Sequence, residues 1–318
     1  LAEPGLRIPN MFSAALDGTF RGLFVQGEDI AQSDPDSHHV LAALRAMDCV
    51  IVQDLFVNET AAFAHVFLPG TSFLEKDGTF INAERRINRV RPAMPEKQGL
   101  SEWETVCRLS TAMGFEMHYD NAAQIMDEIA ALTPTFAGVS FERLDNGPSI
   151  QWPCNEAAPD GTPVMHVGGF VRGKGHFMMT QYVPTEERSN RHFPLLLTTG
   201  RILSQYNVGA QTWRTANSRW HDEDLLEIHP ADAEMRGVRD GDMVSLSSRK
   251  GAVTVRATIT DRVPPGIVYT TFHHPETGAN VVTTELSDWA TSCPEYKVTA
   301  VQVSPSNMPS DWQAERER

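Results

Sequence analysis

The chain has 318 residues, of which 41% are hydrophobic and 21% charged, a balance typical of a globular protein large enough for two domains. Its 41 Asp and Glu residues against 27 Lys and Arg residues give a formal net charge of −14. This charge argues against a nucleic-acid partner, because a phosphate backbone binds clustered basic residues, and equally against an anionic membrane surface. Apolar runs stay short of the roughly 20 residues that cross a bilayer, so we expect no membrane insertion.

The four cysteines, Cys49, Cys107, Cys154 and Cys293, are far apart and form no paired spacing. A zinc or iron–sulfur site built from this chain alone is therefore not expected. We expect buried free thiols in a reducing compartment, and hence a cytoplasmic protein. The chain begins LAEPGLRIPN, without an initiator Met or a signal-peptide pattern, and finishes in a charged, helical-looking tail, so we expect a segment of a longer polypeptide.

The first part of the chain predicts alternating strands and helices. A strand ends at Gly27, and Asp34 offers an N-cap for the helix that follows it. CVIVQD is a continuous apolar strand of the kind that is buried in a parallel sheet, and Asn58 can cap the next helix. The expected elements are a strand at 21–27, a helix at 35–48, a strand at 49–54, a helix at 59–64 and a strand at 65–70. This order is typical of an open, doubly wound α/β sheet.

Two amphipathic helices are predicted further on, at 101–114 and 121–132. Before them, KDGTF indicates a turn with Gly78 in the left-handed conformation. Residues 134–190 are rich in Pro and Gly and show little periodicity. We interpret them as an ordered connection, because the aromatic residues Phe136, Phe141, Trp152 and Phe170 require burial.

From about residue 193 the pattern becomes mainly β. Alternating stretches at 243–248 and 252–260 flank Arg249, Lys250 and Gly251, which is a hairpin signal. A strand at 225–230, a short helix at 231–238 and a strand at 266–274 complete the pattern. Many short strands around one helix predict a small closed barrel.

Carboxylates follow two of the predicted parallel strands. Glu28 and Asp29 come after Gly27, and Asp54 comes after Gln53. Ligands of open parallel sheets bind beyond the carboxyl ends of the strands. A carboxylate accepts two parallel hydrogen bonds, so Asp29 and Asp54 suit a guanine base or a ribose diol. Each could instead cap the next helix. No GxGxxG motif occurs, so an ordinary nicotinamide site is not indicated.

A second polar cluster follows the apolar run FPLLL. Thr198, Thr199, Gly200 and Arg201 bring backbone N–H groups, hydroxyls and a guanidinium to one strand end, and Gln205 to Asn207 extend the polar surface. This set suits a pyrophosphate, since glycine admits close approach and Arg binds two phosphate oxygens. The alternative is a barrel strand that enters a solvent loop, with Arg201 in a surface ion pair.

No catalytic acid, base, nucleophile or metal-ligand set stands out in this chain. His38 and His39 are adjacent in a predicted helix, and His273 and His274 close a strand. Adjacent histidines do not easily face one metal, so we expect exposed or internally hydrogen-bonded side chains.

In this order, the motifs resemble the C-terminal part of the molybdenum- or tungsten-dependent formate dehydrogenase alpha (catalytic) subunit, of the dimethyl sulfoxide reductase superfamily. The resemblance covers nearly the whole chain. It rests on FVQGEDIAQSDPD, VIVQDLF, HVFLPGTSFLEKDGTFINAERR, SEWE, IQWPC, TTGRILSQYN, HPADAEMRGVRDGD, SSRKG and GANVVTTELSDWATSCPEYKVTAV.

The resemblance implies a bis-molybdopterin guanine dinucleotide cofactor with molybdenum or tungsten. It implies a partial Rossmann-like α/β domain at 1–150, a connecting segment at 151–190 and a double-psi β-barrel domain at 191–318. By motif, the implied cofactor contacts are Gly27, Glu28, Asp29, Gln53, Asp54, Lys76, Glu102, Thr199, Gly200, Arg201, Ile202, Leu203, Ser204, Gln205, Tyr206, Asn207, Val208, Phe272, Asn280 and Lys297. Glu102 stands where relatives often have Asp.

The implied function is oxidation of formate to CO₂, with electrons passed through iron–sulfur clusters, and NAD⁺ as the expected acceptor. The metal-ligating Cys or selenocysteine and the iron–sulfur cysteines of the family belong to an upstream half, so this segment alone is expected to be inactive. The implied partners are that upstream half and iron–sulfur or flavin electron-transfer subunits. The alternatives are a molybdenum nitrate reductase and the pterin-free large iron–sulfur subunit of respiratory NADH dehydrogenase. The nucleotide-facing residues argue against the second.

Overall fold

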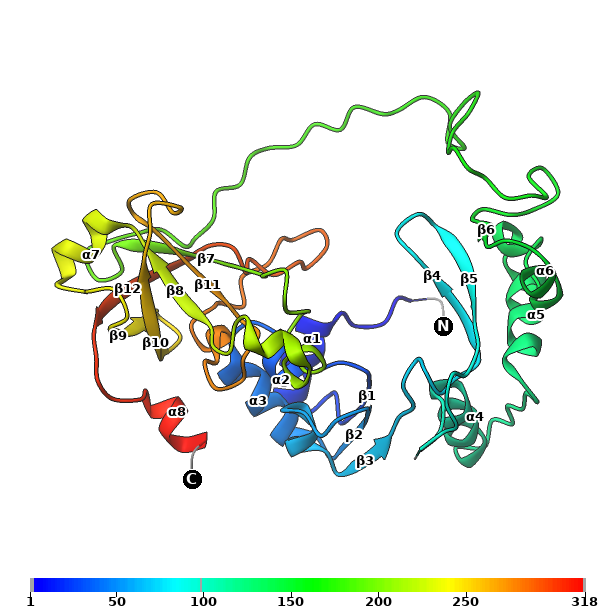
Figure 1. Cartoon of the computed structure of the whole chain (residues 1–318), viewed down its shortest axis with the longest axis horizontal. Helices are drawn as coiled ribbons and strands as arrows, with labels where there is room; N and C mark the ends of the chain where they lie inside the picture. Colours follow the sequence, from blue (N-terminus) through cyan, green and yellow to red (C-terminus); the bar gives the residue numbers. More distant parts are fainter. Residues whose placement is uncertain (1–2, 98, 317–318) are drawn as a thin grey trace. The chain divides into compact units, whose positions relative to one another are not determined.

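The computed structural model describes residues 3–97 and 99–316 and contains two compact units (Figure 1). The first unit combines residues 1–67 with residues 183–318, and the second comprises residues 68–182. The first unit therefore joins the start of the chain to its β-rich end. The division into domains at 1–150 and 191–318, joined by a segment at 151–190, stays a prediction.

The α/β part of the first unit carries a small sheet of three strands in the order β1-β2-β3. β1 and β2 are parallel and in register from Gly22 opposite Cys49 to Gln26 opposite Gln53. The elements are α1 (Ile8–Leu16), β1 (Gly22–Gln26), α2 (Ile30–Ser33), α3 (Ser37–Ala46), β2 (Cys49–Asp54), the 3₁₀ helix η1 (Thr60–Phe63) and β3 (Val66–Pro69). The predicted strands and helices are confirmed, whereas α1 and α2 were not anticipated.

The N-cap of α3 differs from the prediction. Asp36, in the left-handed conformation at φ 52°, accepts a hydrogen bond from the backbone N–H of His39. Asp34 instead follows the last residue of α2. The prediction was wrong by two residues because the separate helical turn α2 precedes the main helix. Asn58 does accept from the N–H of Ala61 at the start of η1, as expected.

The barrel closes in the strand order β10-β8-β11-β7-β12-β9. Its strands are β7 (Leu195–Gly200), β8 (Leu225–Ile228), β9 (Met243–Ser247), β10 (Ala252–Ile259), β11 (Ile267–Thr271) and β12 (Thr299–Pro305). β7 is parallel to β11 and β8 is parallel to β10, while β9 and β10 form the predicted antiparallel hairpin. The closed barrel is confirmed.

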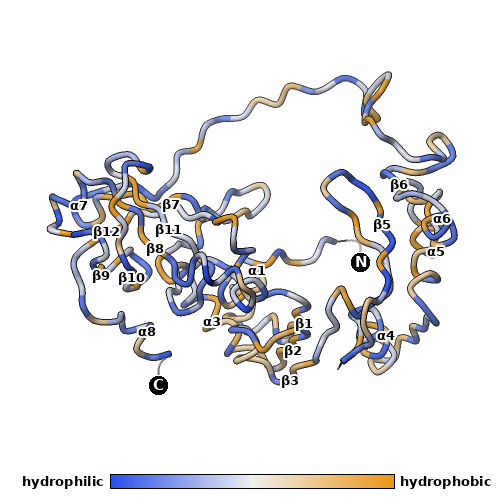
Figure 2. The backbone as a smooth tube through the Cα atoms, in the orientation of Figure 1, coloured by the Kyte–Doolittle hydropathy of each residue, from blue (hydrophilic) through white to orange (hydrophobic). Residues whose placement is uncertain are grey.

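Alternate side chains of the barrel strands fill its interior. In β9, Val244 and Leu246 are fully buried, and Leu226 and Ile228 are buried in the same way in β8. Figure 2 shows hydrophobic stretches along the barrel strands and along β1 and β2. Against the barrel strands pack α7 (Pro230–Arg236), α8 (Asp311–Arg316) and the 3₁₀ helix η5 (Ala279–Val281). The 3₁₀ helices η3 (Thr212–Arg214) and η4 (Ala216–Arg219) pack on each other between β7 and β8 in the sequence. The predicted helix at 231–238 and the helical tail are thus present.

The second unit contains an antiparallel sheet, in the order β4-β5-β6, and a small helical core. Its elements are β4 (Gly78–Ile81), β5 (Arg86–Val90), α4 (Glu102–Ala112), α5 (Ala122–Leu132), η2 (Pro134–Phe136), α6 (Phe141–Asn146) and β6 (Ile150–Gln151). Both predicted amphipathic helices are confirmed. The turn expected at KDGTF is wrong, because Gly78 begins β4 and the chain turns later, with Arg85 at φ 63°.

The predicted burial of four aromatic residues holds for three of them. Phe141 is buried in the core of the second unit, and Phe136 and Trp152 pack against that core. Phe170 is 65% exposed, within a stretch that has no helix or strand from residue 152 to residue 194. The cysteine prediction is correct for Cys107 and Cys154, but Cys49 and Cys293 are exposed. Across residues 3–97 and 99–316, no helix combines the length and apolarity needed to cross a membrane.

Candidate functional site

A cleft of about 890 Å³ lies in the first unit, where the α/β part meets the barrel. Eleven of the twenty residues predicted as cofactor contacts line it. They are Gly27, Glu28, Asp29, Asp54, Arg201, Tyr206, Asn207, Val208, Phe272, Asn280 and Lys297. The strand-end carboxylates and the arginine cluster, more than 140 residues apart in sequence, thus face one cavity.

The α/β side of the cleft is acidic. Asp54, at the end of β2, accepts from the N–H of Leu55 at 2.6 Å and from the side-chain amide of Asn58 at 3.0 Å. A carboxylate in this position is of the chemical type that accepts hydrogen bonds from a ligand donor pair. Asp54 therefore combines local hydrogen bonds to Leu55 and Asn58 with a position on the cleft wall.

Asp29 has a more internal role than predicted. It is 5% exposed and accepts from the N–H and the hydroxyl of Thr60 at 2.9 and 2.7 Å, and from the N–H of Glu59 at 3.4 Å. Burial raises the pKa of this carboxyl in spite of these hydrogen bonds. The side chain thus anchors the start of η1 to α2. It makes no capping hydrogen bond to α2, the helix that follows it, so it differs from the capping alternative.

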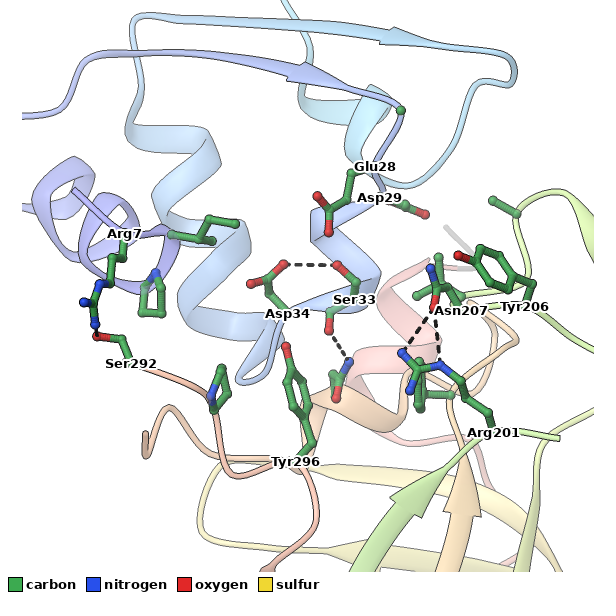
Figure 3. A pocket seen from close by; sticks show the side chains of 18 of the residues that line it. Arg7, Glu28, Asp29, Ser33, Asp34, Arg201, Tyr206, Asn207, Ser292 and Tyr296 are labelled. Carbon is green, nitrogen blue, oxygen red and sulfur yellow. Dashed lines mark hydrogen bonds between the residues drawn. The ribbon is translucent and has the colours of Figure 1, made fainter. Parts of the chain in front are cut away.

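Buried Asp34 and half-buried Tyr296 add two groups to the cleft that the sequence did not predict as contacts. Asp34 accepts a hydrogen bond from the hydroxyl of Ser33 at 3.1 Å, and burial raises its pKa to about 6. Burial also raises the pKa of the Tyr296 phenol. Figure 3 shows Asp34 and Tyr296 close to each other in the cleft, beside Glu28.

The barrel side of the cleft is cationic. The guanidinium of Arg201 donates to the side-chain oxygen of Asn207 at 3.1 and 3.3 Å and lies over the Phe272 ring, 5.1 Å from its centroid. Lys297 donates to the carbonyl of Thr199. Burial, assisted by the neighbouring Arg201, lowers the pKa of Lys297. Figure 3 shows Arg201 and Asn207 on one side of the cleft and Glu28 and Asp34 on the other.

Two glycines near the site serve different purposes. Gly27 has φ 67°, and a Cβ at this position would meet nothing within 4 Å, so it turns the chain at the cleft edge. A Cβ on Gly200 would lie 2.5–2.9 Å from the ring of Tyr269. The space on the Cβ side of Gly200 is therefore filled by Tyr269. The expected contact of Gly200 with a phosphate stays a prediction.

The two walls of the cleft are joined through α2. Gln32 donates from its side-chain amide to the carbonyls of Val208 and Phe272 at 3.1 and 3.2 Å. Asn280 donates from its amide to the carbonyls of Gln32 and Ser33 at 2.8 and 3.1 Å. Asn280 lines the cleft, and its side-chain N–H groups are used in the hydrogen bonds to these two carbonyls.

The remaining predicted contacts lie outside the cleft lining. Gln53 is buried and accepts from Gln26 at 2.8 Å. Thr199 donates to the carbonyl of Tyr296, and Gln205 accepts from the hydroxyl of Thr212. Lys76 and Glu102 belong to the second unit, where they form an ion pair. The others are Gly200, Ile202, Leu203 and Ser204.

Several lining residues escaped the sequence analysis. They are Arg7, Ile8, Pro9, Ser33, Asp34, Ala210, Gln211, Thr291, Ser292, Pro294 and Tyr296. Asp34 was predicted to be a helix cap. The stretch at 291–296 lies inside the motif GANVVTTELSDWATSCPEYKVTAV, of which only Asn280 and Lys297 were predicted as cofactor contacts. The sequence held no periodic signal that would bring the start of α1 to the cleft.

The cleft has the chemistry required by a dinucleotide. Carboxylates at one side can accept the donor pair of a guanine base, and cations at the other can bind a diphosphate. Its volume lies within the range usual for small-molecule sites. Among the residues that the structure describes, no group of three or more His, Cys, Asp or Glu residues could hold a metal ion. The carboxylates and cations of the cleft fit the nucleotide end of a cofactor.

Comparison with known families identifies the class of protein. The molybdopterin oxidoreductase family matches residues 2–112, and the molydopterin dinucleotide binding domain matches residues 195–300. The chain belongs to the molybdopterin oxidoreductases and carries a domain that binds the molybdopterin dinucleotide cofactor.

The relatives define the chain further. It is 39% identical over 305 residues to "F420-dependent formate dehydrogenase 1 subunit alpha" of Methanococcus maripaludis, covering 94% of this chain and 45% of that protein. It is 33% identical over 311 residues to "Formate dehydrogenase H" of Escherichia coli strain K12, covering 96% of this chain and 44% of that protein. The chain thus spans less than half the length of these relatives.

A solved structure shows the same fold. Acetylene hydratase from Pelobacter acetylenicus superposes with a TM-score of 0.72 at 15% identity, covering 94% of this chain and 46% of that chain. At this identity the similarity supports the architecture, a parallel α/β sheet with a closed barrel, and carries no argument about the reaction.

Proposed function

We propose that the first unit holds the nucleotide part of a molybdopterin guanine dinucleotide. The observation that carries the proposal is the single cleft in which Asp54, at the end of β2, shares a cavity with Arg201 and Lys297 of the barrel. We assign Arg201 and Lys297 to the diphosphate, because a guanidinium and an ammonium are strong donors to phosphate oxygens. Asp54 is assigned to the guanine edge.

Other residues of the cleft act by positioning. Asp29 holds η1 against α2, and Asn280 holds α2 against the barrel, so both fix the distance between the acidic and the cationic wall. Gly27 turns the chain between β1 and these residues. Preorganisation of this kind lowers the ordering cost of binding.

We propose that the complete protein is a formate dehydrogenase catalytic subunit that oxidises formate to CO₂. The sequence similarity to formate dehydrogenase alpha subunits supports this proposal. When bound, the pterin–metal group supplies the two-electron redox chemistry, and the residues of this chain bind and orient it. The choice between molybdenum and tungsten, the iron–sulfur or flavin partners and the upstream half remain proposals.

The electron acceptor is open to a direct test. NAD⁺ is the acceptor predicted from the sequence, whereas the names of three relatives specify F420. The proposal also includes a double-psi topology of the barrel, domain boundaries at 150 and 190, and cofactor contacts of Lys76 and Glu102. It further includes inactivity of the segment alone and a cytoplasmic location.

The test is an assay of the complete, cofactor-loaded protein with formate and three acceptors: an artificial dye, NAD⁺ and F420. Formate-dependent dye reduction supports the proposed activity, and the natural acceptor that is reduced identifies the physiological route. Nitrate-dependent oxidation of a pre-reduced dye, with no formate-dependent dye reduction, would instead establish the nitrate reductase alternative.

A further inference from the structure

His273 lies at the junction of the barrel and the loop that carries Arg201. It is the second residue after the end of β11, directly after Phe272, and it is fully buried. The segment from Arg201 to Gly209, here called the 201–209 loop, packs on it. A Cβ on Gly209 would lie 2.5 Å from the His273 carbonyl oxygen, so the loop approaches as closely as glycine permits.

Both ring nitrogens of His273 are bonded to the backbone of this loop. The N–H of Ile202 donates to Nε2 at 3.1 Å, which requires Nε2 to carry a lone pair. Nδ1 contacts the carbonyl oxygen of Asn207, which requires Nδ1 to carry the proton. The two contacts together select one neutral tautomer. The imidazole thus bridges the two ends of the loop from inside.

The backbone of His273 is fixed in turn by Asp224, which is 2% exposed. Its carboxylate accepts from the N–H of His273 at 3.1 Å and from the N–H of His274 at 3.0 Å. It also accepts from the hydroxyl of Thr271 and contacts Nδ1 of His274 at 3.2 Å. A buried carboxylate with this many donors holds the end of β11 in one arrangement.

The loop held in this way presents the cationic wall of the cleft. Arg201 stands over the Phe272 ring and donates to Asn207, whose carbonyl oxygen is the one bonded to His273. Asn207 adopts the left-handed conformation at φ 46°, which Asn tolerates better than most residues other than glycine. The two bonds to the imidazole hold the backbone of Ile202, next to Arg201, and the backbone of Asn207, the side-chain partner of Arg201.

We infer that His273 is a positioning residue whose neutral imidazole clamps the 201–209 loop in the shape that presents Arg201 to the dinucleotide. The last part of this inference rests on the proposed function, whereas the clamp itself does not.

Protonation of His273 opposes the clamp. A proton on Nε2 would face the N–H of Ile202 and replace an acceptor by a donor. The charged groups facing the ring are Arg201 and His274, which disfavour a second cation, and Asp224, which favours one. Burial is the largest effect and lowers the pKa of His273 from its ordinary value of 6.5. The clamp is therefore complete above that value and is lost as the pH falls through the lowered pKa.

The test is hydrogen exchange, read by mass spectrometry, on peptides covering 201–209 in the complete protein, purified with and without cofactor. Protection factors, corrected for intrinsic exchange, are compared between about pH 8 and about pH 5 for the wild type, His273→Gln, His273→Ala and the exposed-residue control His192→Gln. The Gln side chain keeps an acceptor near the position of Nε2 but does not titrate. The His273→Gln variant therefore still tests the clamp if His273→Ala does not fold.

The wild type and His192→Gln are expected to lose roughly fivefold or more of their loop protection in acid. His273→Ala should be unprotected at both pH values, and His273→Gln should lack the acid-dependent loss. Equal loop protection in the wild type and His273→Ala, or the same acid-dependent loss in His273→Gln, would overturn the clamp. If the cofactor-free protein behaves as expected but neither His273→Ala nor Arg201→Ala lowers bound pterin, the clamp stands and the proposed function fails.

Discussion

The side-chain amide of Asn280 donates to the main-chain carbonyl of Ser33 at 3.1 Å. The same nitrogen donates to the carbonyl of Gln32 at 2.8 Å, and the hydroxyl of Thr283 donates to the amide oxygen. Asn280 is 3% exposed, so these bonds are shielded from water. One buried side chain therefore joins the end of α2 to the barrel and sets the separation of the two cleft walls.

Replacement Asn280→Asp tests this link. The variant keeps the shape of the side chain but places carboxylate oxygens against two carbonyl oxygens, which removes two donors and adds repulsion. We expect a loss of about 2–4 kcal/mol in unfolding free energy, because buried carbonyls lose their partners beside a buried charge. Thermal unfolding of the complete protein measures the effect.

Asn146→Asp provides a matched control. Asn146 also donates its amide to a carbonyl, that of Glu142 at 3.0 Å, but it is exposed on α6. The control should cost less than about 0.5 kcal/mol, as is usual for surface substitutions. Equal losses for the two Asn→Asp variants would show that Asn280 does not carry the link.

Gly200 and Tyr269 form a second testable pair. Gly200→Ala places a methyl group 2.5–2.9 Å from the Tyr269 ring and should destabilise the barrel by about 1–3 kcal/mol through overpacking. In a Tyr269→Ala background the methyl group has room, so its cost should fall below about 0.5 kcal/mol. Unfolding of the four members of this double-mutant cycle gives the coupling. Strictly additive costs would mean that Gly200 serves another purpose.

The buried carboxyl of Asp34 predicts a pH-dependent stability. Its pKa of about 6 in the folded protein exceeds the ordinary 3.8, so the folded state binds the proton more tightly. This contribution to stability is present below about pH 4 and is lost as the pH rises through about 6. Asp34→Asn cannot ionise and keeps an acceptor for Ser33. It should therefore stabilise the protein at about pH 8, by on the order of 2 kcal/mol.

The measurement is the difference in Tm between Asp34→Asn and the wild type at about pH 8 and about pH 4. The difference should be positive at the higher pH and should shrink towards zero at the lower. The exposed carboxylate Asp160 supplies the control Asp160→Asn, which should show little difference at either pH. A Tm difference for Asp34→Asn that does not change with pH would exclude the buried, protonated carboxyl.

Arg201→Ala in the complete protein should lower bound pterin and bound metal together. Loss of a charge-assisted contact to a diphosphate corresponds to roughly a 10- to 100-fold weaker cofactor affinity. Arg201→Lys keeps the charge without the forked geometry and should give an intermediate content. Arg219, exposed on η4 and outside the cleft lining, supplies the control Arg219→Ala. Full occupancy in Arg201→Ala would contradict the phosphate role.

The predictions from sequence were accurate where a local pattern has a single physical cause. The apolar run CVIVQD fits a buried parallel strand, and the alternation around Lys250 fits a hairpin, so β2, β9 and β10 lie where expected. Local patterns were less informative at helix starts. Two Asp residues lie within three positions there, and only the fold decides that Asp36 is the cap of α3.

The candidate site was predicted in part, for a similar reason. Strand-end position predicted Asp54 and Arg201, because the ends of strands meet at one edge of a sheet or barrel. Sequence could not assign the partners of a polar side chain. Asp29 and Asn280 were expected to contact a ligand, yet their hydrogen bonds hold Thr60 and Gln32. His273 was expected only to be exposed or internally hydrogen-bonded. Its proposed role depends on a contact with Asn207, 66 residues away in the sequence, which no local pattern predicts.

The most direct measurement is an experimental structure of the complete, cofactor-loaded protein. The account predicts diphosphate density within hydrogen-bonding distance of Arg201 or Lys297, and a purine edge facing Asp54. Cofactor density located elsewhere, with this cleft filled only by solvent, would contradict it.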